Sequence, residues 1–231
     1  MKILLIGFQR SGTTLLRRLM ELHPDVKCML HETRLLKRKN LQNIEAISRF
    51  VKNFKSKGYY WYKGEDPVTE TWGEKVPWYG NGRSIFSYTT KWLKMFGDEA
   101  KIVHIVRHPV DVALSNVRLR WAPNIKAVVR EYAKSVPKTV RMFDNQRCLV
   151  ITFEDLLLNS VDILKEVFEF CGVSTSDKII NKIISAKKDK LRYFNGINKD
   201  RAFAYKKVKD LKYVCKFDYD ALVKEINEKQ I

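Results

Sequence analysis

The sequence predicts an α/β fold in which a mostly parallel sheet is flanked by helices on both faces. Short apolar segments alternate along the 231 residues with longer segments of helical periodicity, a pattern typical of parallel strands joined by crossover helices. Near the N-terminus a glycine-containing turn connects the first apolar segment to the first helical one. The length fits one large domain or two small ones, and we expect a single domain over residues 1–231.

The first half of the chain is expected to contain short strands, helices and a long loop region. The leucines of residues 13–22 recur with helical spacing, and His23-Pro24 ends this helix because proline cannot continue it. Residues 58–83 hold five Gly and two Pro together with many aromatic side chains, which predicts an ordered loop region because flexible linkers lack aromatics. The expected elements are strands at 2–8 and 26–30 and helices at 13–22, 38–54 and 84–96.

The second half is expected to continue the alternation. Residues 101–106 form a near-continuous apolar run suited to a central parallel strand, and Pro109 then opens a helix at a point where its missing N–H costs little. Asn159 or Ser160 is expected to cap a later helix that ends near Gly172. The other expected elements are a strand at 149–153 and helices at 123–144, 175–190 and 219–228.

The composition indicates a basic protein with an anionic partner. The 44 Lys and Arg against 26 Asp and Glu give a net charge of +18, which favours nucleic acid, a membrane surface, a polyphosphorylated cofactor or an acidic acceptor as the partner. No apolar run approaches the ~18 residues that span a membrane, so no membrane span is expected. The four cysteines form no C-x-x-C pair, which indicates reduced thiols and a cytoplasmic location.

A phosphate-binding turn is predicted at Gly7-Phe8-Gln9-Arg10-Ser11-Gly12-Thr13-Thr14. Backbone N–H groups of such a turn point inward, and the dipole of the following helix adds partial positive charge. The G-x-x-x-x-G spacing matches a nucleotide-binding P-loop, so the predicted sheet is of the P-loop type. Thr13 stands where a P-loop has its lysine, and the nearest cation is Arg10. The turn therefore lacks the lysine that binds the β- and γ-phosphates of a magnesium-bound triphosphate. A less charged 5′ group fits the turn better.

A second anion site is predicted after the apolar run that precedes Arg107. The following helix carries Asp111, Ser115 and Arg118 on one face. A cation at the carboxyl end of a strand and a hydroxyl on the next helix can hold a phosphate at the ligand-binding edge of a parallel sheet. Two separate sites suit a nucleotide with phosphates at its 3′ and 5′ ends, whereas an ordinary nucleoside triphosphate does not need them.

Both motifs resemble those of sulfotransferases that use 3′-phosphoadenosine 5′-phosphosulfate (PAPS). The run Arg10-Ser11-Gly12-Thr13-Thr14-Leu15-Leu16 is similar to the family's 5′-phosphosulfate-binding loop, and residues 106–115 are similar to its 3′-phosphate-binding segment. The resemblance implies PAPS as cofactor, adenosine 3′,5′-bisphosphate as product, and no metal. It assigns cofactor binding to Arg10, Ser11, Gly12, Thr13, Thr14, Arg107 and Ser115.

A third segment extends the resemblance to about residue 173. The run Thr152-Phe153-Glu154-Asp155-Leu156 is similar to an aromatic-Glu-Asp-Leu segment that follows a late strand in this family. We expect Glu154 or Asp155 to cap or brace the loop. The resemblance is weak over residues 36–72 and beyond 175, and the role of the basic segment 187–216 stays open.

Sulfuryl transfer to a hydroxyl needs a base for the acceptor proton and a cation to offset charge on the bridging oxygen. Glu32, followed by Thr-Arg, is similar to the base of the tyrosylprotein sulfotransferase branch, the nearest branch in local motifs. Lys75, in a Lys-x-Pro setting, is similar to the family's catalytic lysine. By the same resemblance Arg10 faces the transferring group and Arg34 binds the acceptor. His31 is an alternative base, because its ordinary pKa lies nearer neutrality.

The sequence therefore predicts a PAPS-dependent sulfotransferase whose acceptor carries a phenolic, tyrosine or sugar hydroxyl and, given the positive charge, is anionic. A P-loop kinase of a nucleoside or small metabolite is the alternative enzyme, and the missing P-loop lysine speaks against it. A nucleic-acid-binding protein would fit the charge, but the sequence shows no helix-turn-helix, zinc or RNA-recognition signature. We therefore expect no nucleic-acid partner.

Overall fold

A five-stranded parallel sheet forms the centre of the computed structural model, which describes residues 1–41, 43–53, 62–80, 82–141, 146–192 and 224. The strands lie in the order β2-β3-β1-β4-β5, and each neighbouring pair is parallel. Their bounds are β1 Lys2–Phe8, β2 Val26–His31, β3 Thr71–Trp78, β4 Ala100–Val106 and β5 Cys148–Thr152. The predicted α/β fold with a parallel sheet is confirmed.

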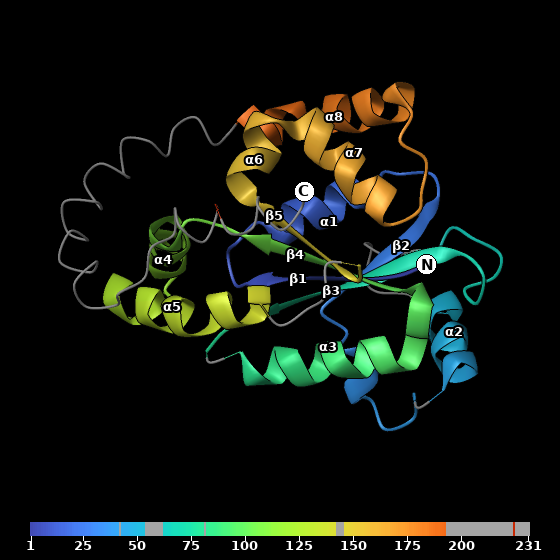
Figure 1. Cartoon of the computed structure of the whole chain (residues 1–231), viewed down its shortest axis with the longest axis horizontal. Helices are drawn as coiled ribbons and strands as arrows, with labels where there is room; N and C mark the ends of the chain where they lie inside the picture. Colours follow the sequence, from blue (N-terminus) through green and yellow to red (C-terminus); the bar gives the residue numbers. More distant parts are fainter. Residues whose placement is uncertain (42, 54–61, 81, 142–145, 193–223, 225–231) are drawn as a thin grey trace.

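Helices cover both faces of this sheet (Figure 1). The helix α4 (Pro109–Arg118) packs against α5 (Ile125–Arg141) beside the carboxyl ends of the strands. None of the helices in the described part of the chain has both the length and the apolar character needed to cross a membrane. One face carries α1 (Thr13–Met20), α6 (Phe153–Leu158), α7 (Ser160–Phe170) and α8 (Asp177–Arg192), the other carries α2 (Ile44–Asn53), α3 (Arg83–Phe96) and α5 (Ile125–Arg141), and α4 spans Pro109–Arg118.

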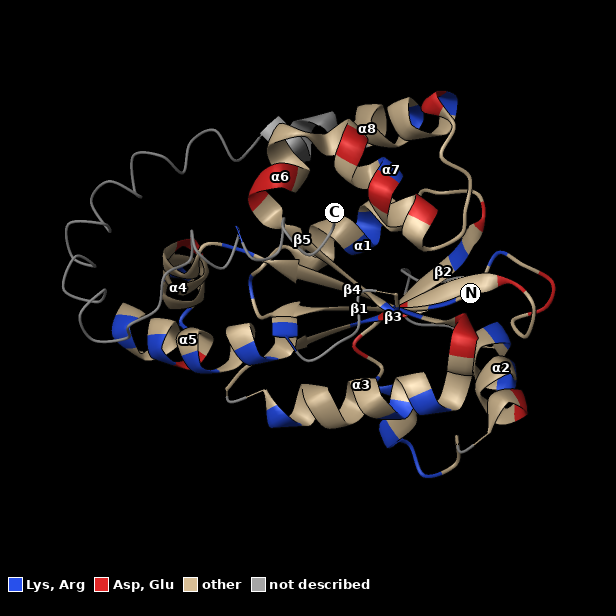
Figure 2. Ribbon diagram, viewed as in Figure 1, with Lys and Arg blue, Asp and Glu red and all other residues tan. Residues whose placement is uncertain are grey.

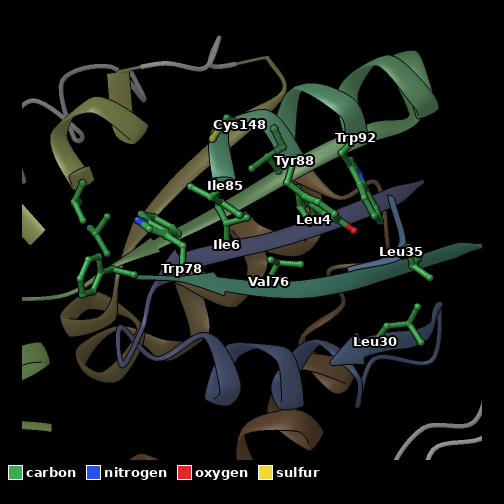
Figure 3. Close-up of a cluster of buried hydrophobic side chains, with 14 of the residues drawn as sticks. Leu4, Ile6, Leu30, Leu35, Val76, Trp78, Ile85, Tyr88, Trp92 and Cys148 are labelled. Carbon is green, nitrogen blue, oxygen red and sulfur yellow. The ribbon is translucent and has the colours of Figure 1, made fainter. Parts of the chain in front are cut away.

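The core has two layers, one on each face of the sheet, and β1 contributes to both. Side chains of a strand point alternately to opposite faces, so Ile3 and Leu5 enter one layer, and Leu4, Ile6 and Phe8 enter the other. All five are at most 1% exposed, and burial of one such side chain stabilises the fold by about 1.5–3 kcal/mol. Figure 3 shows the second layer, between the strands and α3. The two layers hold β1 rigidly and so fix the start of the loop that follows it.

The prediction of a loop region over residues 58–83 is wrong, because β3 lies within it. β3 is an inner strand, paired with β2 on one side and β1 on the other. Its sequence contains a glycine, a proline and the ionisable neighbours Glu74 and Lys75, which are not typical of a buried strand. Gly73 is required by close packing, since a Cβ there would lie 2.5 Å from the carbonyl oxygen of Ile3.

Smaller differences concern the ends of elements. The helix expected over 38–54 begins only at Ile44, and a 3-10 helix, η1 (Leu35–Lys37), precedes it. A further 3-10 helix, η2 (Gly97–Glu99), leads into β4. The helix capped near residue 160 is confirmed, although the Asn159 side chain makes no capping hydrogen bond. The aromatic residues at 59–61, the basic segment from 193 to 216 and, apart from residue 224, the helix expected at 219–228 lie outside the described residues.

Candidate active site

The predicted functional residues gather near the carboxyl ends of adjacent strands. β1 lies between β3 and β4, so the loop after β1 is flanked by the strand that carries Lys75 and the strand that leads into Arg107. The segment after β2 adds Glu32, whose N–H donates to the carbonyl oxygen of Lys75 (2.9 Å). Ligands of open parallel sheets bind at this edge, where the strand order reverses.

The loop after β1 has the geometry of an anion cradle. Gly12 has a left-handed backbone (φ 97°) and precedes α1, to which it offers no side-chain cap. The first N–H groups of a helix have no partner within the helix, so those of Thr13 and Thr14 suit an anion. The Ser11 hydroxyl is fully buried and meets no hydrogen-bond partner among the described residues. These features fit a bound phosphate or sulfate group.

Phe153 packs against both predicted anion sites. A Cβ at Gly12 would lie 2.2 Å from Cδ2 of Phe153, so only glycine fits there. The guanidinium carbon of Arg107 lies 4.5 Å from the centre of the same ring. The next residue, Glu154, accepts the N–H of His108 at 3.0 Å. Glu154 or Asp155 was expected to cap or brace the loop; Glu154 braces the loop after β4 through His108, and Asp155 accepts the Thr152 hydroxyl (2.5 Å) at the start of α6. The contacts of Phe153 with Gly12 and Arg107 were not predicted from the sequence.

Arg107 lies at the centre of the second predicted anion site. Its Nη1 donates to the carbonyl oxygen of Arg10 (3.2 Å), and its Nη2 lies 3.9 Å from the Asp111 carboxylate. The Tyr132 hydroxyl donates to the backbone carbonyl of Arg107 (2.6 Å). Arg107 is only 6% exposed. The protein itself therefore holds this guanidinium in place, which lowers the entropy cost of binding an anion.

Arg10 connects the two predicted anion sites. Its Nε donates to the Ser115 hydroxyl (2.8 Å), and its guanidinium carbon lies 5.2 Å from the ring centre of Trp121. Its backbone is left-handed (φ 75°), which is uncommon outside glycine. The structure thus places the Arg10 side chain beside Ser115 of the predicted 3′ site, whereas the family resemblance predicted it at the transferring group. Trp121 was missed by sequence reasoning, and the available signal was a large aromatic residue in a polar turn.

Glu32 and Lys75 form an ion pair. Lys75 Nζ donates to Glu32 Oε1 at 2.6 Å, and the side chains are 2% and 45% exposed, respectively. Burial lowers the pKa of Lys75, and the hydrogen bond that Lys75 donates to Glu32 partly opposes this. His31 Nε2 lies 3.5 Å from the same Oε1, and burial, followed by the charge of Lys75, lowers the pKa of His31. The predicted base, the predicted cation and the alternative base are therefore in contact.

A buried carboxylate that sequence reasoning missed, Glu74, lies in β3 next to the lysine of this ion pair. Glu74 is fully buried and accepts the Thr33 hydroxyl (2.7 Å), the N–H of Arg34 and the N–H of Leu35 (3.3 Å). It also accepts the Tyr88 hydroxyl (2.5 Å). Burial raises the pKa of Glu74, although these hydrogen bonds oppose the rise.

Arg34, the predicted acceptor-binding cation, borders a pocket between η1 and α3. Apolar and aromatic side chains line this pocket together with two cations, Lys37 and the predicted acceptor-binding residue Arg34. Its lining residues are Arg34, Lys37, Val76, Pro77, Trp78, Ser84, Ile85 and Tyr88.

The described ranges contain no group of three His, Cys, Asp or Glu side chains placed to hold a metal ion. Metal-free chemistry was expected from the sequence, and it stays a prediction. The kinase alternative is not favoured, since the cradle has Thr13 where a P-loop has its phosphate-binding lysine.

Comparison with known proteins identifies the class of protein that this fold and site define. The family model described as "Sulfotransferase family" matches residues 2–177. The chain therefore belongs to the sulfotransferase family and is an enzyme. No curated protein sequence matches it. The likeness to the tyrosylprotein branch remains a prediction.

Solved sulfotransferase structures share this fold. Mouse sulfotransferase SULT7A1, complexed with PAP, is 19% identical with a TM-score of 0.50 over 80% of this chain, which spans 63% of that protein. The sulfotransferase domain of the Synechococcus PCC 7002 olefin synthase is 22% identical with a TM-score of 0.54, covering 78% of this chain and 76% of that domain. A sulfotransferase from Alicyclobacillus acidocaldarius is 17% identical with a TM-score of 0.50, covering 95% and 97%.

Proposed function

We propose that this sulfotransferase transfers a sulfuryl group from PAPS to a hydroxyl group of an anionic acceptor. The observation that carries the proposal is the pairing of two anion sites, the cradle at Ser11–Thr14 and the Arg107–Ser115 pair, which Arg10 connects. A nucleotide with anionic groups at both its 5′ and 3′ ends needs two such sites. The mouse structural neighbour is complexed with PAP, which is in keeping with this choice of cofactor.

The residues of the two sites fit this cofactor. The buried Ser11 hydroxyl and the N–H groups that begin α1 would hold the 5′ end. Arg107 and Ser115 would hold the 3′-phosphate by charge-assisted hydrogen bonds. When bound, PAPS supplies the sulfuryl group for transfer.

We propose that Glu32 accepts the proton of the acceptor hydroxyl and that Lys75 offsets the negative charge that develops during the transfer. The Glu32 side chain is 45% exposed, so an acceptor hydroxyl can reach it and give up its proton. Lys75 holds a buried positive charge 2.6 Å from that carboxylate, where it can offset negative charge on the bridging oxygen. The Arg10 side chain, expected at the transferring group, hydrogen-bonds to Ser115 (2.8 Å) in this structure, so its proposed role lies at the 3′ end of the cofactor. His31 is the alternative base, since its lowered pKa keeps it uncharged at neutral pH.

An anionic acceptor is favoured by the distribution of charge. Figure 2 shows that the charged residues of α5, beside the end of the molecule where α4 lies, are mainly Lys and Arg. Such a basic face attracts anions and speeds their encounter with the site. Arg34 and Lys37 add two cations at the acceptor pocket. The exposed basic residues on one side of α5 recur every fourth position: Lys126, Arg130, Lys134 and Lys138.

Ligand-dependent thermal stability tests the proposal. Adenosine 3′,5′-bisphosphate without magnesium should raise the Tm, because saturation at 100 times Kd adds about 2.7 kcal/mol to the free energy of unfolding. Turnover with labelled PAPS across hydroxyl acceptors should then select anionic ones, with a KM that rises with salt as charges are screened. Stabilisation by ATP with magnesium, and none by the bisphosphate, would refute the proposed function.

A further inference from the structure

We infer that Glu74 and Tyr88 form a buried clamp that positions Glu32 for proton transfer, an inference that rests on the proposed function. Both residues lie beneath the segment after β2 that carries Glu32. Glu74 is fully buried and Tyr88 is 2% exposed, so neither can take the acceptor proton itself. We therefore assign them a positioning role that acts through the backbone of residues 33–36.

The clamp holds three successive backbone N–H groups at the start of η1. Glu74 accepts the N–H of Arg34 and of Leu35 (3.3 Å). The Tyr88 hydroxyl accepts the N–H of Leu36 (3.2 Å) and donates to Glu74 (2.5 Å). Figure 3 shows Tyr88 reaching from α3 into the space between that helix and the strands. Side chains from β3 and α3 thus satisfy N–H groups that the helix start cannot pair internally.

The segment needs such a clamp because its backbone is strained. Glu32 (φ 56°) and Arg34 (φ 49°) both have left-handed conformations, which non-glycine residues rarely adopt. Such conformations persist only when the surrounding structure enforces them. Thr33, between them, donates its hydroxyl to Glu74 at 2.7 Å. Glu74 therefore fixes both residues that follow the proposed base.

Two consecutive residues of β3 act on the segment that carries Glu32: Lys75 binds the Glu32 carboxylate, and Glu74 belongs to the clamp. Side chains alternate along a strand, so Lys75 and Glu74 reach opposite faces of the sheet. Lys75 holds the Glu32 carboxylate at 2.6 Å from one side, while Glu74 holds the following backbone from the other. A displacement of the segment by about 1 Å would break the alignment of the base, and errors of this size can lower a rate by about 100-fold.

Hydrogen exchange tests the clamp without requiring activity. In Glu74→Gln, an NH₂ group replaces one of the two oxygens that accept the N–H groups of Arg34 and Leu35. We expect the amides of residues 34–36 to exchange about 10- to 100-fold faster, the effect of losing a hydrogen bond to a charged group. Amides of β1 should keep their wild-type rates. Unchanged exchange at 34–36, or equally faster exchange in β1, would overturn the clamp.

Kinetics then test positioning. Glu74→Gln and Tyr88→Phe should lower kcat about tenfold or more, and the Kd of adenosine 3′,5′-bisphosphate should stay within about twofold, since neither residue touches the cofactor sites. Thr89→Val is the matched control. It removes a buried α3 hydroxyl that donates to the carbonyl of Ile85 (2.8 Å), and both kcat and the Kd of the bisphosphate should keep their wild-type values.

Wild-type kcat in Glu74→Gln despite faster exchange at 34–36 would overturn the inference. A wild-type protein without sulfuryl transfer would instead refute the proposed function, and the exchange rates would still decide the clamp.

Discussion

Replacing Arg107 by alanine should remove most of the affinity for adenosine 3′,5′-bisphosphate and leave the chain folded. Arg107 is 6% exposed and already fixed by contacts with Arg10 and Asp111. Its side chain therefore loses little entropy when it binds a phosphate, and little offsets the free energy of the bonds that it forms. A charge-assisted hydrogen bond contributes about 1.5–3 kcal/mol. Loss of the guanidinium should therefore cost about 3 kcal/mol, or roughly 100-fold in Kd.

Isothermal titration calorimetry at fixed salt measures this Kd, and urea unfolding shows that the variant is folded. Arg107→Lys keeps the charge but loses the planar fork, so its Kd should lie between those of the wild type and Arg107→Ala. Arg130→Ala is the matched control, since it removes one exposed cation of α5 and should change Kd by about twofold or less. A folded Arg107→Ala variant that binds the bisphosphate with wild-type Kd would show that Arg107 lies outside the site.

Other perturbations test the base, the cradle and the core. Glu32→Gln should keep the bisphosphate Kd but lower kcat by about 100-fold or more, and a surviving kcat would transfer the role of base to His31. Gly12→Ala should weaken bisphosphate binding and destabilise the fold by about 1–3 kcal/mol, because an added Cβ meets Phe153 at 2.2 Å; equal unfolding midpoints in urea would contradict this. Burial lowers the pKa of His104 to about 3, so the unfolded chain takes the proton first and stability should fall below pH 6.5 by about 1.4 kcal/mol per pH unit. His104→Leu should flatten that slope in pH-dependent unfolding, and an unchanged slope would exclude His104 as its cause.

The grouping of the residues proposed to bind anions could be predicted because each group is local in the sequence. The cradle is one uninterrupted turn between a strand and a helix, and Arg107 and Ser115 belong to one strand end and the helix that follows it. Backbone geometry alone brings such neighbours together. The link between the two sites was not predictable, since the hydrogen bond from Arg10 to Ser115 joins positions 105 residues apart.

The strand β3 was missed for a physical reason. A central strand usually consists of β-branched and aromatic residues, whereas this one places Glu74 and Lys75 at its middle. Burying an ionised side chain is costly unless a partner compensates it. The partner of Lys75 and three of the four hydrogen-bond donors to Glu74 come from residues 32–35, which lie more than 35 residues away in the sequence, and the fourth donor is Tyr88 of α3. Local pattern could therefore not show that these charges were tolerable inside a sheet.

The buried charges of Glu74 and Lys75, on the two faces of β3, are compensated to different degrees. This difference favours a functional role for the pair of Lys75 and Glu32. Glu74 accepts four hydrogen bonds in full burial, as a structural carboxylate should. Lys75 is as deeply buried, but its partner Glu32 is 45% exposed and held in a left-handed backbone. A purely structural ion pair gains nothing from keeping one partner open to solvent and strained. A base that must receive a proton from an incoming hydroxyl requires that openness, and the lysine beside it keeps the carboxylate oriented until the hydroxyl arrives.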